Sequence, residues 1–178
     1  MRDDSTARSL NDSLPRTLDL PPTAKQGPGT DSYQKITMDG VIVTCWYGNI
    51  SSEALDTWQR LIDEQYEKVG GPVGLVICIR ETSSPPEGDF RRQAARLMFS
   101  DKVGIISLIF EGSGFRAAIV RSVLAMIFTL GGKRQTPYKV TDDVRQGSAW
   151  FVENAPSNGW VPRASDLHQV VDALMRSS

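Results

Sequence analysis

The stretch VGLVICI at residues 73–79 decides the fold class. It is apolar throughout and lacks the alternation of apolar and polar residues that a half-buried strand shows. Such a run is typical of a central strand covered on both faces. A second run of this kind, VGIISLIF, follows at residues 103–110. Because strands buried on both sides require helices on both faces of their sheet, the two runs predict an α/β fold.

Upstream of the first run, the chain predicts a β-hairpin. Ile36 and Met38 alternate with polar residues, Asp39-Gly40 follows, and residues 41–47 form the β-rich run VIVTCWY. Asp-Gly between two such runs is a strong hairpin signal, because a type I′ turn needs the positive φ that glycine adopts easily. The hairpin would make the sheet mixed rather than purely parallel.

Helical periodicity fills the remaining segments and sets the expected order, β-β-α-β-α-β-α-β-α with an extra C-terminal helix. We expect a mixed, mostly parallel five-stranded sheet with helices on both faces. The expected helix starts are Ser51 or Ser52, Ser84 before Pro85-Pro86, Gly114, Thr141 and Ser165. Residues 1–32, rich in Ser, Thr, Asp, Pro and Gly, predict a disordered arm. Residues 33–155 form the expected domain, and residues 156–178 a loop and an amphipathic helix.

Composition excludes several classes of protein. The 178 residues carry a net charge of -1, which argues against a dedicated nucleic-acid binder. Two cysteines and one histidine are too few for a disulfide scaffold or a Cys- or His-rich metal centre, so no cofactor is expected. The N-terminus has no apolar run, and the most apolar stretch, residues 117–130, is shorter than the ~20 residues of a membrane span. Cys45 and Cys78 fit buried, reduced thiols, which favours a cytoplasmic protein.

Three passages resemble the STAS (SpoIIAA-like) domain of anti-sigma-factor antagonists and its SEC14-like relatives. They are residues 41–55, residues 73–79, and residues 138–143 leading to Trp150. Signalling members carry an Asp-Ser-Ser/Thr-Gly-type motif after the third strand, and a partner kinase phosphorylates it. Here that stretch reads RETSSPPEG at residues 80–88. The resemblance therefore implies Ser83 and Ser84 as candidate phosphosites, although the surrounding motif is absent and Ser84 also fits a helix N-cap.

The clearest chemical candidates flank the third expected helix. Residues 111–115, EGSGF, follow a buried strand and open that helix, where free backbone N–H groups could face an anion. A structural turn explains them equally, since they match neither a P-loop nor a nucleophile elbow. A basic strip would form from Arg91, Arg92, Arg96, Arg116 and Arg121 if the second and third helices lie side by side, although a solvated helix face explains these arginines as well. The candidate partner or anion-binding surface is Arg91, Arg92, Glu111, Ser113 and Arg116.

The third helix is apolar around more than the stripe a surface helix needs. Either the C-terminal helix, through residues 167–174, covers it, or it leaves a surface for a partner or a second copy. We expect a non-enzymatic, cytoplasmic module for regulatory protein–protein interaction, whose partner is a kinase or signalling protein, or the chain itself as a homodimer. The alternative is a small-molecule or lipid-binding SEC14-like domain with an apolar cavity lined by residues such as Trp46, Phe99 and Met126. A weaker alternative is a serine hydrolase using Ser113, which would need as its base the single histidine, His168, of the C-terminal helix.

Overall fold

The computed structural model confirms the expected order of elements. It describes residues 33–38, 40–48, 51–84, 86, 88–112, 114–130, 136–156 and 162–176. The expected N-terminal arm (residues 1–32), Ser113 and the side chain of Arg116 lie outside this description. The elements are β1 Tyr33–Met38, β2 Val41–Trp46, α1 Ser52–Val69, β3 Val73–Ile79, α2 Gly88–Met98, β4 Val103–Phe110, α3 Gly114–Leu130, β5 Tyr138–Thr141, α4 Val144–Asn154 and α5 Ala164–Arg176.

The five strands form one mixed sheet in the order β1-β2-β3-β4-β5. β1 and β2 are antiparallel and meet at a tight turn in which Gly40 has φ 79°, as the Asp-Gly signal predicts. The other three pairings are parallel. Trp46, Ile79 and Phe110 are neighbours across the sheet, so β2, β3 and β4 end together at one carboxyl edge.

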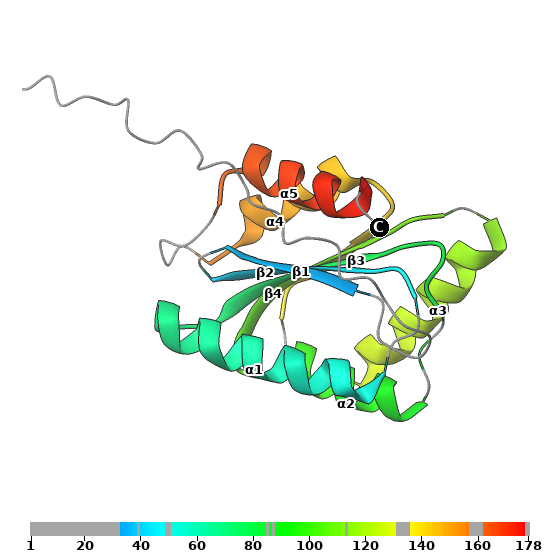
Figure 1. Ribbon diagram of the computed structural model, residues 1–178, viewed down its shortest axis with the longest axis horizontal. Coiled ribbons are helices and arrows are strands. Elements are labelled where there is room, and N and C mark those ends of the chain that lie inside the picture. Colours follow the sequence, from blue (N-terminus) through cyan, green and yellow to red (C-terminus); the bar gives the residue numbers. More distant parts are fainter. Residues whose placement is uncertain are drawn as a thin grey trace, which may run out of the picture.

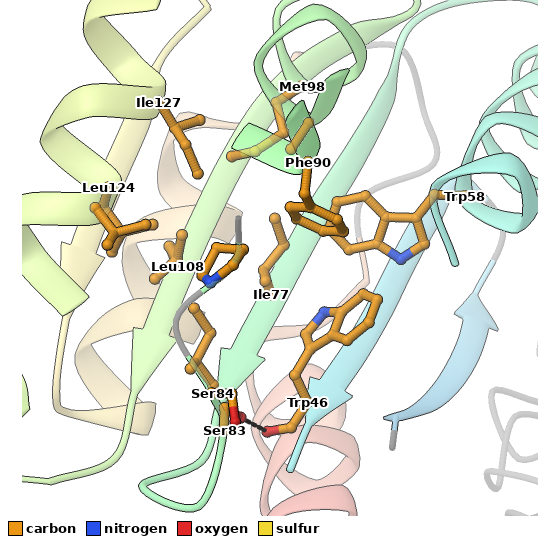
Figure 2. A pocket seen from close by; sticks show the side chains of 14 residues that line it. Trp46, Trp58, Ile77, Ser83, Ser84, Phe90, Met98, Leu108, Leu124 and Ile127 are labelled. Carbon is orange, nitrogen blue, oxygen red and sulfur yellow. Dashed lines mark hydrogen bonds between the residues drawn. The ribbon is translucent and has the colours of Figure 1, made fainter. Parts of the chain in front are cut away.

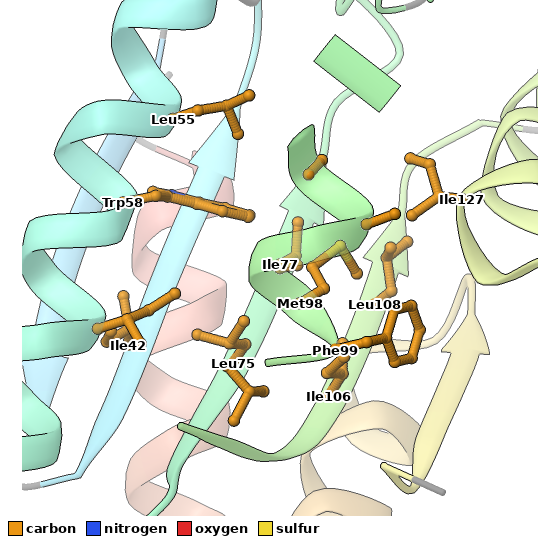
Figure 3. Close-up of a cluster of buried hydrophobic side chains, with 14 of the residues drawn as sticks. Ile42, Leu55, Trp58, Leu75, Ile77, Met98, Phe99, Ile106, Leu108 and Ile127 are labelled. Atoms are coloured by element: carbon orange, nitrogen blue, oxygen red, sulfur yellow. The ribbon is translucent and has the colours of Figure 1, made fainter. Parts of the chain in front are cut away.

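Helices cover both faces of the sheet (Figure 1). Alternate strand residues, such as Ile42, Leu75 and Leu108, pack with α1, α2 and α3 on one face (Figure 3). The intervening residues, such as Val43 and Cys78, pack with α4 and α5 on the other. The core therefore has two layers separated by the sheet, which explains why β3 and β4 are apolar without alternation.

The position of α5 overturns one expectation. One of the two alternatives for α3 is that the C-terminal helix covers it, but the inward residues of α5 pack on the face opposite α3: Leu167, Val170, Val171 and Leu174. The cause is the right-handedness of β-α-β crossovers. Strands β2 to β5 follow one another in both sequence and space, so the three crossover helices fall on one face. The opposite face is then left for α4 and α5.

Three expected helix starts are wrong. Helix α2 begins at Gly88, so Ser84 is not its N-cap. The backbone N–H of Ser84 instead donates to the carbonyl of Gly48 at 3.3 Å, which ties the loop back to the end of β2. The N-cap of α4 is Asp143 rather than Thr141, because its carboxylate accepts from the N–H of Gln146 at 3.0 Å. Helix α5 begins at Ala164, ahead of Ser165.

Helix α4 lies close against β4 because residue 147 has no side chain. A Cβ on Gly147 would stand 2.8 Å from the Cγ1 atom of Ile109, and the Ser107 hydroxyl donates to the Gly147 carbonyl at 3.1 Å. Beneath α5, both cysteines are buried free thiols, as predicted, and burial raises the pKa of Cys78 well above its usual value. Within the described ranges, no helix has both the length and the apolarity that crossing a bilayer requires.

Candidate functional site

An apolar pocket opens near the carboxyl edge of the sheet, under α1, α2 and α3 (Figure 2). The strands supply its floor, the three helices its walls, and the loop after β3 one side of its mouth. Its lining residues are Trp46, Trp58, Ile77, Ile79, Ser83, Ser84, Pro86, Phe90, Ala94, Met98, Leu108, Val123, Leu124 and Ile127. Ser84 is exposed, so the pocket meets solvent beside this residue.

Aromatic rings order one wall of the pocket. Trp46, at the end of β2, is stacked on Tyr33 with ring centroids 4.5 Å apart. The Trp58 ring from α1 meets Trp46 edge-on at 5.4 Å. Both tryptophans are almost fully buried. Since neighbouring rings restrict one another, this wall is in place before any ligand arrives.

The cavity is small. Its volume is about 80 Å³, against roughly 150 Å³ for an apolar protein cavity that admits benzene. It therefore suits one compact apolar group, such as an aliphatic side chain or the end of an acyl chain. A whole lipid needs several times this space.

Few polar atoms face the pocket. The Ser83 hydroxyl donates to the carbonyl of Trp46 at 2.8 Å, which leaves its proton engaged. The indole Nε1 of Trp58 is buried and has no hydrogen-bond partner among the described residues. In Figure 2 this nitrogen lies on the side of the ring that faces Trp46, whose π surface is at most a weak acceptor. This nitrogen is buried, so it is not an accessible donor for a ligand in the pocket as the side chains stand.

Arg80 holds the loop side of the pocket in place. Its Nε pairs with the Glu111 carboxylate at 2.5 Å, and its Nη1 donates to the carbonyl of Met175 near the end of α5. Its own N–H donates to the Trp46 carbonyl at 2.7 Å. The Arg80 side chain therefore links the ends of β3, β4 and α5. Glu111, which we expected on a partner or anion-binding surface, is engaged in this link.

Replacing Arg80 tests that structural role. We expect Arg80→Met to lower the free energy of unfolding by about 1–2 kcal/mol, because the partly exposed ion pair with Glu111 and the hydrogen bond to the Met175 carbonyl are lost together. The side chain is 20% exposed, so the pair is only partly screened by solvent. Urea unfolding followed by circular dichroism measures the change. The control is Arg92→Met, which removes the exposed Arg92–Asp89 pair and should change stability by less than about 0.5 kcal/mol. Equal effects of the two changes would contradict the role of Arg80.

The expected basic strip is brought together only in part. Helices α2 and α3 do pack against each other. Arg92 is exposed, whereas Arg91 is half-buried and its Nε has no partner among the described residues. Arg121 of α3 lies over the Phe110 ring, with its guanidinium carbon 5.3 Å from the ring centroid.

The serine-hydrolase alternative needs His168 as the base for Ser113. His168 belongs to α5, which packs on the face of the sheet opposite α3.

Only one of the three expected cavity residues lines the pocket. Trp46 does. Phe99 is buried next to the end of α2 but faces elsewhere in the core, and Met126 is 46% exposed. The pattern missed Trp58, although Leu55, Trp58 and Ile62 recur at helical spacing on α1 and mark its inward face.

Within the described part of the chain, no group of three or more His, Cys, Asp or Glu residues is placed to hold a metal ion.

Comparisons of the chain with protein-family models, with curated proteins and with solved structures found no match. The resemblance to STAS domains therefore rests on the sequence passages alone.

Proposed function

We propose that this protein is a non-enzymatic module for regulatory protein–protein interaction, and that its apolar pocket receives one apolar side chain of a partner protein. The observation that carries the proposal is a small, carbon-lined cavity that opens to solvent beside Ser84. Protein interfaces concentrate their binding energy in a few anchor side chains that fill such pockets. The volume matches one anchor rather than a whole ligand.

The mouth of the pocket offers a means of regulation. The STAS resemblance makes Ser83 and Ser84 candidate phosphosites for a partner kinase. The Ser83 hydroxyl is bonded inward to Trp46, whereas Ser84 is exposed, so Ser84 is the more accessible of the two. A phosphate on Ser84 would put about two negative charges beside an apolar opening and oppose the entry of an apolar anchor. Two buried free thiols fit the reducing cytoplasm as the compartment.

Filling the pocket tests the proposal. Ala94 of α2 lines the pocket and is 2% exposed, so the larger side chain of Ala94→Leu would occupy the cavity. We expect this variant to gain about 0.5–2 kcal/mol of stability, as cavity-filling changes do. It should also bind peptides that insert an apolar anchor into the wild-type pocket at least about tenfold more weakly, because the binding energy of that anchor is lost.

The peptides would come from a displayed random library selected on the wild-type protein. Affinities for wild type, Ala94→Leu and the control Gln93→Leu, at an exposed neighbouring position, are then compared by fluorescence anisotropy. Selected peptides that share an apolar anchor and lose binding only in Ala94→Leu support the proposal. Peptides that bind all three proteins equally overturn it. Sedimentation of the same proteins tests the homodimer, which predicts that Ala94→Leu shifts a dimer to monomers.

The carbon-lined walls of the pocket also favour a second candidate, a small-molecule or lipid-binding domain. Its ligand would place an acyl end in the pocket and its polar end at the mouth beside Ser84. Native mass spectrometry of the purified protein should then show a bound carboxylic acid or ester, and Ala94→Leu, which fills the pocket, should reduce its occupancy. A ligand-free spectrum, together with no binding of added octanoate, excludes this candidate.

A further inference from the structure

A second hollow lies between α3 and the edge strand β5, apart from the apolar pocket. Its volume is about 420 Å³, within the range of small-molecule sites. Its lining residues are Phe110, Arg121, Leu124, Ala125, Tyr138, Val140, Thr141, Asp142 and Gln146. We call this hollow the edge groove.

The edge groove follows from how α3 packs. Leu124 and Ile127 join the core and α3 lies beside α2, so the described residues cover the neighbouring face of β5 only in part. Tyr138 is 49% exposed there and Val140 is half-buried. The β5 side of the edge groove therefore offers the ring of Tyr138 and the Val140 side chain, and Ala125 lines the α3 side.

Opposite charges stand on the walls of the edge groove. Arg121 comes from α3, and Asp142 from the start of the segment that leads into α4. Both are exposed, and neither takes part in an ion pair with the described residues. Gln146 lies beside Asp142, and its Oε1 accepts the Thr141 hydroxyl proton at 2.8 Å, which leaves the amide N–H groups to donate.

We propose that the edge groove binds a free α-amino acid with an apolar side chain. The carboxylate would pair with Arg121, the ammonium group with Asp142, and the side chain would lie against Tyr138 and Val140 of β5. Charge complementarity selects this class, because a simple anion would meet the Asp142 carboxylate and a simple cation the Arg121 guanidinium. A zwitterion satisfies both walls at once. The Tyr138 ring and the Val140 side chain favour phenylalanine or leucine over glycine.

Calorimetric titration of the full chain with four probes tests the assignment. L-Phenylalanine should bind, whereas glycine, phenylalanine amide and N-acetylphenylalanine should each bind at least about tenfold more weakly, since each lacks one of the three contacts. Arg121→Gln should abolish the preference for phenylalanine over its amide. Asp142→Asn should abolish the preference over N-acetylphenylalanine. Arg145→Gln and Glu153→Gln, both exposed and outside the groove lining, are the matched controls and should bind like wild type.

Two results would overturn the inference: no saturable binding of phenylalanine at millimolar concentration, or equal binding of all four probes. The site is independent of the apolar pocket, although Leu124 borders both. Ala94→Leu should therefore leave phenylalanine binding unchanged. Failure of the peptide experiment and failure of this one can be told apart.

Discussion

Replacement of Phe151 by alanine should lower the free energy of unfolding by about 3–5 kcal/mol, which is the usual cost of removing a fully buried aromatic side chain. Phe151 is 0% exposed and lies in the layer between the sheet and the pair α4 and α5. Its neighbours cannot collapse freely into the space. Helix α4 is already fixed against β4 at Gly147, and Arg80 holds the end of α5.

Urea unfolding of Phe151→Ala, followed by both circular dichroism and tryptophan fluorescence, measures the effect. Such a loss is a large fraction of the 5–15 kcal/mol that stabilises an ordinary domain. The control is Glu153→Ala on the exposed side of the same helix, which should change stability by less than about 0.5 kcal/mol. A loss below about 1.5 kcal/mol for Phe151→Ala would mean that α4 is not a fixed part of the core.

The sheet could be predicted from the sequence because its signals are local. The strands β3 and β4 are apolar on both faces, and Asp39-Gly40 joins two β-like runs. Each signal fixes one element without knowledge of the others. The position of α5 could not be predicted from a local signal, because an apolar stripe indicates that a helix is covered but not which element covers it. Only the handedness of the crossovers decides which face is left open.

The candidate site could be predicted less well, because α3 has no distinct polar side. On such a helix the sequence does not show which residues turn inward: among the described side chains of α3, the expected cavity residue Met126 is exposed, whereas Leu124 and Ile127 are buried. The start of α2 was misplaced for a similar reason. A serine followed by two prolines matches a helix start, but hydrogen bonds from Ser83 and Ser84 to the end of β2 hold those residues in a loop. Such long-range bonds leave no local pattern.

The two faces of the sheet also differ in how they are built. The layer beneath α4 and α5 holds Phe151 and four fully or almost fully buried α5 residues. The layer beneath α1, α2 and α3 contains the pocket, and the edge groove lies beside it. Changes in the first layer should act on stability alone. Changes at the pocket should act on stability and recognition together. Trp46 should show both effects, because it lines the pocket and is almost fully buried in the core.

We expect Trp46→Ala to lose about 3–5 kcal/mol of stability, including about 0.5–1.5 kcal/mol for its ring pairs with Tyr33 and Trp58. Unlike Phe151, Trp46 borders an existing cavity, so its removal would join the indole space to the pocket. Its carbonyl would still accept from Arg80 and Ser83, and these bonds should keep the mouth of the enlarged cavity in place.

An enlarged apolar cavity that keeps its shape should bind the group that was removed. Added indole should therefore stabilise Trp46→Ala, by about 2.7 kcal/mol at a hundred times its dissociation constant. Thermal unfolding with and without indole measures the gain, and Trp150→Ala, a half-buried tryptophan on α4, is the control that indole should not rescue. Equal stabilisation of both variants by indole would show that the gain is nonspecific. No stabilisation of Trp46→Ala would contradict the expectation that the enlarged cavity keeps its shape, and would show that the pocket collapses without its aromatic wall.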